Sequence, residues 1–240
     1  MDAMTSAPTL PPVLHEPPAG TRVRGVLALI AGAGEGADVY ARFGRRLAFD
    51  GYVVGVFSGD DTARTQAWLV AQEPGPRVLV GSDRGAAIAL TAAAGARGAG
   101  IDGVIVAGLP IAGRDDASAS PEERSACPVH LGVLAAQDAP GDTRSAAAIP
   151  GDRALAGIRV PVLAIHGGAD PIAPVGTARE TLAAVPELEF VETVDGLHDA
   201  LNDQSHRSVA ATIVLWLERL RAGSVEQPIV RHPLVEAARA

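Results

Sequence analysis

The stretch Arg77-Val-Leu-Val-Gly-Ser-Asp-Arg-Gly-Ala-Ala-Ile-Ala-Leu90 decides the fold. Its apolar first part predicts a buried strand, and its Ala-rich second part predicts a helix that follows directly. Between them, Gly81, Asp83 and Gly85 form the small-x-nucleophile-x-small pattern of a nucleophile elbow, a tight turn that lifts one side chain above the sheet edge. Ser82 is out of frame, because its own flanking positions carry a valine and an arginine, which are too bulky for the turn. Asp83 is therefore the candidate functional residue.

Composition narrows the class of protein. A chain of 240 residues with 48% hydrophobic residues fits one α/β domain with a full core. The net charge of -8 is spread along the chain without a basic stripe, which argues against binding to nucleic acid or to an anionic membrane surface. The single cysteine, Cys127, excludes an internal disulfide and a cysteine-based zinc site. No signal-peptide pattern or membrane-length apolar run is found, so we expect a cytoplasmic protein without an integral membrane segment.

Apolar runs and helical patterns alternate along the chain. We expect strands at 23–30, 52–57, 77–80, 101–107, 160–166 and 188–194, and helices at 38–50 (capped by Asp38), 62–72, 84–94, 176–185 and 205–221. The near-continuous apolar character of the strands is typical of a mostly parallel sheet with helices on both faces. The predicted fold class is therefore α/β.

The alternation of predicted strands and helices divides the chain into segments. Residues 1–21 are rich in Pro, Ala and Thr and predict a flexible N-terminal arm, with an edge strand near 13–16. Residues 22–110 and 159–222 form the predicted α/β core. The polar segment 111–158 interrupts it, with short helices expected at 121–126 and 130–137, and its place between two strands predicts a lid insertion over a pocket. Residues 223–240 form a C-terminal tail.

Three candidate residues follow predicted strands, where open α/β sheets place their sites. They are Asp83 in the elbow, Asp170 in the segment His166-Gly-Gly-Ala-Asp170, and His198 in the segment Asp195-Gly-Leu-His-Asp199. Their order is nucleophile, acid, histidine, and the acid can hold the imidazole in one tautomer so that its other nitrogen faces the reacting centre. Singly, each has a structural interpretation as a turn or surface residue.

Three neighbouring side chains receive structural interpretations. His166 is expected to support the loop of Asp170. Asp199 and Asp203 flank His198 and are explained by N-cap and first-turn roles in the helix that follows.

At these motifs the chain resembles the α/β-hydrolase superfamily, in the branch of monoacylglycerol lipases and lysophospholipases. The stretch Ala31-Gly-Ala-Gly-Glu-Gly-Ala-Asp-Val-Tyr40 is similar to the branch's His-Gly-x-Gly-Glu-His-Ser-x-x-Tyr loop. His166-Gly-Gly-Ala-Asp170 with Pro174 matches its acid loop, and Gly196-Leu-His-Asp-Ala-Leu-Asn-Asp203 matches its histidine loop. The resemblance covers about residues 22–221. It implies an α/β-hydrolase fold and a hydrolase.

The resemblance implies a role for each matching residue. Asp83 takes the position of the nucleophile, Asp170 that of the acid and His198 that of the base. The backbone N–H groups of Ala33 and Arg84 take the positions of the oxyanion hole. Two departures stand out: the family's first-loop histidine is an alanine here, and its nucleophilic serine is Asp83.

An aspartate changes the chemistry. Attack of a carboxylate on an ester carbonyl gives an anhydride, which is uphill for ordinary esters, whereas an sp³ carbon with a good leaving group is a suitable electrophile. Asp83-Arg-Gly-Ala86 resembles the elbow of haloacetate dehalogenases, in which Arg84 would bind a substrate carboxylate. The predicted lid lacks the tyrosines that epoxide hydrolases use, and Arg84 stands where haloalkane dehalogenases have a halide-binding Trp.

The sequence thus favours a lysophospholipase-like hydrolase of a small organic substrate with an Asp83–His198–Asp170 triad. A dehalogenase or epoxide hydrolase that forms an alkyl-enzyme ester is the first alternative. In further alternatives, Asp83 acts as a general base, or the protein is a catalytically inactive binding protein on the same fold.

No metal or cofactor is expected, because the His and carboxylate spacings match no ligand set and the first-loop glycines lack a dinucleotide-binding frame. The oligomeric state is left open.

Overall fold

The structure, a computed structural model, describes residues 11–58, 61–73, 75–95, 100–111, 119–137 and 148–230. This part of the chain forms a seven-stranded sheet with the order β1-β3-β2-β4-β5-β6-β7. The first strand pairs antiparallel with β3, and every other pair is parallel. The strands are Val13–His15 (β1), Gly25–Ile30 (β2), Tyr52–Phe57 (β3), Arg77–Ser82 (β4), Gly103–Ala107 (β5), Val162–Gly167 (β6) and Leu188–Thr193 (β7).

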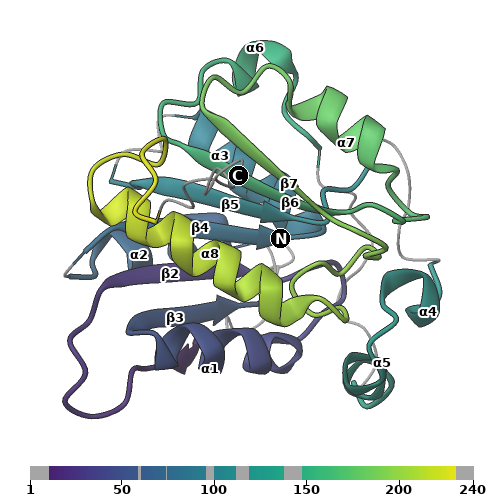
Figure 1. Cartoon of the computed structure of the whole chain (residues 1–240), viewed down its shortest axis with the longest axis horizontal. Helices are drawn as coiled ribbons and strands as arrows, with labels where there is room; N and C mark the ends of the chain where they lie inside the picture. The colour runs from purple at the N-terminus through teal and green to yellow at the C-terminus, as the bar shows by residue number, and fades with distance from the viewer. Residues whose placement is uncertain are drawn as a thin grey trace, which may run out of the picture.

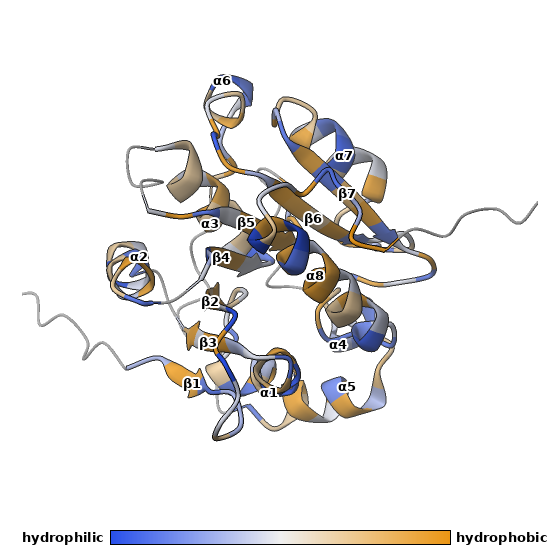
Figure 2. Cartoon of the chain, turned by 60° about the vertical axis from the view of Figure 1, so that its left-hand side comes forward, coloured by the Kyte–Doolittle hydropathy of each residue, from blue (hydrophilic) through white to orange (hydrophobic). Residues whose placement is uncertain are grey.

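Helices cover both faces of this sheet (Figures 1 and 2). They are Ala37–Tyr40 (η1, a 3₁₀ turn), Ala41–Phe49 (α1), Thr62–Val70 (α2), Arg84–Ala94 (α3), Pro121–Arg124 (α4), Pro128–Ala135 (α5), Asp152–Leu155 (α6), Val175–Leu182 (α7) and His206–Arg221 (α8). Apolar side chains of α1 and α8 pack on one face, and those of α2, α3, α6 and α7 pack on the other. The five inner strands, β2 to β6, are buried on both faces, which explains why they are apolar almost throughout.

The sheet register brings the predicted loops to one edge. Ile30 pairs with Gly81, Ser82 with Ala107, and Gly167 with Thr193, so the parallel strands end at nearly the same level. The segments that follow β2, β4, β6 and β7 therefore meet at the carboxyl edge of the sheet, where open α/β proteins bind ligands.

The predicted fold class is confirmed, and the predicted strands and helices occur within a few residues of their expected bounds. One helix differs. Residues 38–50 form η1 followed by α1, and Asp38 does not cap either: Gly36 and Tyr40 precede them without a side-chain cap. Tyr40 is fully buried and binds Gly32 and Glu35, so tertiary contacts and not a local cap set this boundary.

The division of the chain into arm, core, lid and tail stays a prediction. Residues 1–10 of the arm, 112–118 and 138–147 of the predicted lid and 231–240 of the tail lie outside the described residues. The described part of segment 111–158 contains α4, α5 and α6. None of the helices in the described ranges is long and apolar enough to cross a membrane.

Candidate active site

Asp83 occupies the sharp turn between β4 and α3. Its φ of 53° and ψ of -123° are unusual for a residue with a side chain, and such strain is often found at functional sites. The Asp83 N–H donates to the Ala107 carbonyl at 2.9 Å, which ties the turn to β5. The flanking glycines are required: a Cβ on Gly81 would lie 2.1 Å from the Gly85 carbonyl oxygen, and one on Gly85 would lie 2.2 Å from the Ile30 carbonyl oxygen.

Asp170 holds His198 from behind. Its Oδ2 lies 2.8 Å from His198 Nδ1, and its Oδ1 accepts the N–H groups of Ile172 and Ala173 at 2.8 and 2.9 Å. An aspartate side chain that accepts hydrogen bonds from the backbone two and three residues later typically forms a turn of this kind. His166 Nε2 lies 2.6 Å from the Ala173 carbonyl and 3.1 Å from Asp170 Oδ2, so it supports this loop. Burial raises the pKa of Asp170, but the contacts with His166 and His198 outweigh it and the pKa is lowered.

The other ring nitrogen of His198 faces Asp83. Nε2 lies 3.5 Å from Asp83 Oδ1, which makes an ion pair at the long limit of hydrogen-bond reach. Burial raises the pKa of Asp83, but the contact with His198 and the charge of Arg124 outweigh it and bring the pKa to about 2. Burial lowers the pKa of His198, but its contacts with Asp170 and Asp83 outweigh it and bring the pKa to about 10. At neutral pH the resting site is thus an imidazolium between two carboxylates.

The two expected oxyanion donors lie beside Asp83. The Ala33 N–H donates to Asp83 Oδ2 at 3.2 Å, so this backbone group already binds a negatively charged oxygen. Arg84 is the first residue of α3, and its side chain is partly exposed. The structure therefore brings Asp83, His198, Asp170, Ala33 and Arg84 together at one edge of the sheet.

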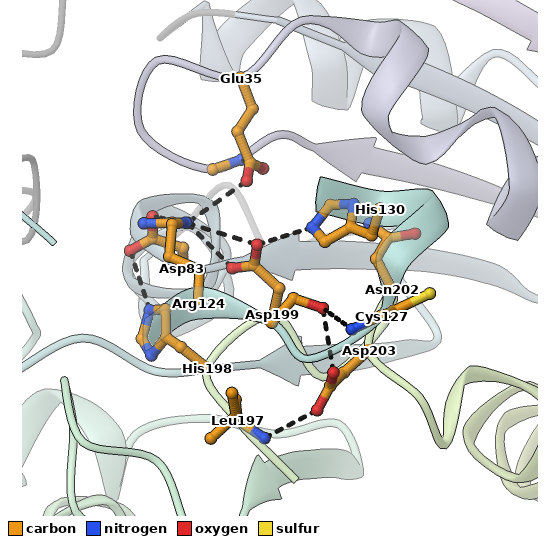
Figure 3. A network of polar contacts seen from close by, with 12 residues as sticks. Glu35, Asp83, Arg124, Cys127, His130, Leu197, His198, Asp199, Asn202 and Asp203 are labelled. Carbon is orange, nitrogen blue, oxygen red and sulfur yellow. Dashed lines mark hydrogen bonds and ion pairs between the residues drawn. The ribbon is translucent and has the colours of Figure 1, made fainter. Parts of the chain in front are cut away.

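A buried arginine that the sequence did not single out completes the centre. Arg124, at the end of α4, places Nη2 3.0 Å from Asp83 Oδ2, 3.3 Å from Glu35 Oε1 and 3.0 Å from Asp199 Oδ1 (Figure 3). Its side chain is only 10% exposed. One guanidinium thus lies among three carboxylates, and the only oxygen of Asp83 that it contacts is the one also bound by Ala33.

The carboxylates around Arg124 have further partners. Glu35 accepts hydrogen bonds from Tyr40 Oη and, at 3.2 Å, from the Gly32 N–H. Burial and the nearby charge of Asp199 raise the pKa of Glu35 to about 7, although Arg124 opposes the shift. Asp199 Oδ2 lies 2.7 Å from His130 Nε2 on α5.

Asp199 and Asp203 do not have the helix-capping roles expected from the sequence. The helix α8 begins at His206 with Ser205 before it, so both carboxylates are free for other partners. Asp203 accepts hydrogen bonds from Ser125 Oγ, the Ala126 N–H and the Leu197 N–H at 3.0, 2.8 and 2.8 Å. These bonds, together with the Arg124–Asp199 ion pair, attach the end of α4 to the loop that carries His198 (Figure 3).

A cavity of about 710 Å³ lies next to this centre, between residues 34–38 and α5. Its walls are mainly apolar, with Val56, Val129 and Val133 among them, and Glu35 lines it as well. Glu35 therefore lies between the cavity and Arg124. Asp83 and His198 are 2% and 1% exposed, so Arg124 and its partners cover the reacting groups in this arrangement. Within the described residues, no group of His, Cys, Asp and Glu side chains is arranged to hold a metal ion.

Comparisons with known proteins bear on the fold. No protein-family model matches the sequence, and no curated protein matches it either. Solved structures do match. A monoacylglycerol lipase from Paleococcus ferrophilus is 17% identical, with a TM-score of 0.72 over 88% of this chain and 100% of that one. A soluble variant of monoglyceride lipase from Saccharomyces cerevisiae, in complex with a substrate analogue, is 16% identical, with a TM-score of 0.74 over 88% and 91%.

A thermostable carboxyl esterase from Bacillus coagulans, in complex with glycerol, is 17% identical, with a TM-score of 0.69 over 86% of this chain and 93% of that one. Together these matches show that the chain has the α/β-hydrolase fold. At such identities the likeness establishes the fold and leaves the reaction to be argued from the residues.

Proposed function

We propose that this protein is a hydrolase that uses Asp83 to open a carbon–halogen bond at an sp³ carbon of a small organic molecule. One observation carries the proposal: the Asp83 carboxylate lies at the elbow with one oxygen on the Ala33 N–H and the other facing His198, which Asp170 holds at 2.8 Å. Each oxygen of Asp83 therefore has a different environment, as a two-step covalent mechanism requires.

The first step needs no base. Asp83 Oδ1 attacks the carbon, a carbon–oxygen bond forms, and the carbon–halogen bond breaks with its electron pair leaving as halide. Asp83 is ionised over the neutral pH range because its pKa is about 2. Ester carbonyls are poor substrates for this nucleophile, because the product would be an anhydride, so we place the lysophospholipase-like reaction second.

The second step is hydrolysis of the alkyl ester on Asp83. Water adds to the Asp83 carboxyl carbon, and negative charge collects on Oδ2, where the Ala33 N–H and the Arg124 guanidinium lie at 3.2 and 3.0 Å. Such donors, fixed before the reaction, stabilise a developing oxyanion. The tetrahedral intermediate then breaks its bond to the alcohol oxygen, which takes the proton that His198 accepted from the water. The remaining water proton passes from the new Asp83 carboxyl group to His198, so the carboxylate and the imidazolium of the resting site are restored. We assign the backbone N–H of Arg84 the same task, and its side chain the binding of a substrate carboxylate.

The charge of Asp83 sets when His198 acts as a base. In the resting site His198 is protonated, since its pKa is about 10. Ester formation neutralises Asp83 and removes one of the two carboxylates that hold this proton, so the pKa of His198 falls. The imidazole can then lose its proton and take one from the attacking water, while Asp170 keeps the ring in place.

Two alternatives differ in their support. Epoxide opening lacks a free phenol near Asp83, because Tyr40 is bound to Glu35 and the other tyrosine, Tyr52, is bound to Glu218. A non-catalytic binding protein is favoured by one observation, the ion pair with Arg124 that neutralises Asp83 in this arrangement.

A substrate panel tests the proposal. The purified protein is incubated with haloacids, haloalkanes, epoxides and p-nitrophenyl esters, alongside Asp83→Asn and His198→Gln. We expect halide release from at least one halogenated class and none from Asp83→Asn. In His198→Gln, mass spectrometry should find the alkyl group retained on the peptide that contains Asp83. In Asp83→Ser, ester cleavage should appear. No turnover of any class by the native protein would rule out the enzyme.

A further inference from the structure

A second cavity, away from the triad, lies between α1 and α8. Its volume is about 620 Å³, within the usual range for small-ligand sites. The two helices lie side by side on one face of the sheet, and no residue of the Asp83–His198–Asp170 constellation lines the space between them (Figure 1). Four arginines do line it, Arg42, Arg45 and Arg46 from α1 and Arg207 from α8.

These cations are poorly compensated. Asp50 is the only acidic residue among the lining residues. Within the described ranges, the side chains of Arg45, Arg46 and Arg207 form no ion pair or hydrogen bond, and all three residues are exposed. Elsewhere arginines commonly pair with carboxylates, as Arg219 does with Glu189 at 2.6 Å. In a chain with a net charge of -8, such a local excess of positive charge is a feature that the fold creates.

Two further features concern the electrostatic field at this cavity. The amino end of α8, which carries the partial positive charge of the helix dipole, lies at the cavity through His206 and Arg207. Burial and the charges of Arg42 and Arg207 lower the pKa of His206. Burial is the largest of these effects, and the charges of the two arginines act in the same direction, so His206 lies within their electrostatic field.

Arg42 has a structural role as well. Its guanidinium donates to the Asn202 carbonyl and lies 3.3 Å from Cys127 Sγ, so it connects α1 to the loop after His198 and to the start of α5. It is thus fixed in place, whereas Arg45, Arg46 and Arg207 can reorient around a ligand.

We propose that the α1–α8 cavity binds a phosphate group attached to an apolar moiety. Several guanidinium groups can each donate two hydrogen bonds to phosphate oxygens, and together they match its double negative charge. Phe49, which is 76% exposed at the same cavity, offers an apolar surface for the rest of the molecule. The ligand is either a soluble phosphate ester or the headgroup of a phospholipid, since both present the same chemistry.

Two binding assays separate these sources. Calorimetry with phenyl phosphate tests the soluble form, and co-sedimentation with vesicles of phosphatidic acid in phosphatidylcholine, against phosphatidylcholine alone, tests the lipid form. The double variant Arg45→Ser/Arg46→Ser should bind at least about tenfold more weakly, the effect of losing one charged hydrogen bond or more. The matched control is Arg153→Ser/Arg159→Ser, which removes two exposed arginines near α6.

Binding in either assay that the first double variant loses and the control keeps supports the site, and the assay that responds identifies the source. Absence of binding in both assays, or equal binding by both double variants, overturns it. The readout is affinity, so the outcome is independent of whether Asp83 is a nucleophile.

Discussion

Replacing Asp83 by Asn should release the proton of His198 near neutral pH. The two groups lie 3.5 Å apart, and at an effective dielectric constant of about 20 their attraction is about 5 kcal/mol. One pKa unit corresponds to about 1.36 kcal/mol, so removing this charge should lower the pKa of His198 by about 3.5 units, from about 10 to about 6.5. Asp170 remains in Asp83→Asn and holds the ring, which is why we do not expect a lower value.

An NMR titration of the histidine ring signals measures this change, with His198 assigned by its absence in His198→Gln. Asp152→Asn, which removes an exposed carboxylate on α6, is the control and should leave the pKa of His198 where it is. A wild-type pKa of His198 near 6.5, or the same pKa in Asp83→Asn and the wild type, would refute the reasoning. The imidazole would then not be coupled to Asp83, and the change of role between the two steps would lose its cause.

Three further predictions follow from the same contacts. Arg124→Gln should slow hydrolysis of the Asp83 ester about 10²–10³-fold, the usual cost of losing one oxyanion donor, whereas unchanged hydrolysis in quenched-flow mass spectrometry would contradict that role. Gly81→Ala should lower the free energy of urea unfolding by at least about 1–3 kcal/mol, since its Cβ would lie 2.1 Å from a carbonyl oxygen, while Gly132→Ala, with no atom within 4 Å, should not. Folding raises the pKa of His198 from 6.5 to about 10, so the stabilisation that its proton contributes is complete below pH 6.5 and is lost as the pH rises toward 10. The free energy of urea unfolding should therefore decrease over this pH range, and it should decrease less in His198→Gln than in the wild type.

The elbow and the triad could be predicted because their signals are local. The turn at Asp83 has no room for a Cβ at Gly81 or Gly85, so the sequence must carry glycine there. Asp170 follows the buried strand β6 and His198 follows the half-buried edge strand β7, and the parallel register brings the ends of these strands together. Apolar strands and helical patterns of this kind are read directly from the residues.

Arg124 could not be predicted, because its position depends on contacts far along the chain. The sequence around it does carry a helix-start signal, a capping box in which Ser120 and Glu123 exchange hydrogen bonds. That signal places a short helix but does not indicate that the next side chain turns inward toward Asp83. For the same reason the sequence gives no role to Glu35 and assigns Asp199 to a helix start, since the arginine that both contact comes from another segment.

The arginines of the second cavity show the same limit. Arg42, Arg45 and Arg46 recur at helical spacing, which indicates a common face of one helix, but nothing local places Arg207 opposite them. The sequence therefore suggested evenly spread charge, whereas packing of α1 against α8 concentrates it.

A single turnover in ¹⁸O-water, with the enzyme in excess over a halogenated substrate, tests the central claim most directly. If Asp83 is the nucleophile, water attacks the enzyme ester. Mass spectrometry should then find ¹⁸O in the peptide that contains Asp83 and none in the first alcohol released. An alcohol that carries ¹⁸O while the Asp83 peptide carries none would mean that water attacks the substrate itself, and it would contradict the account.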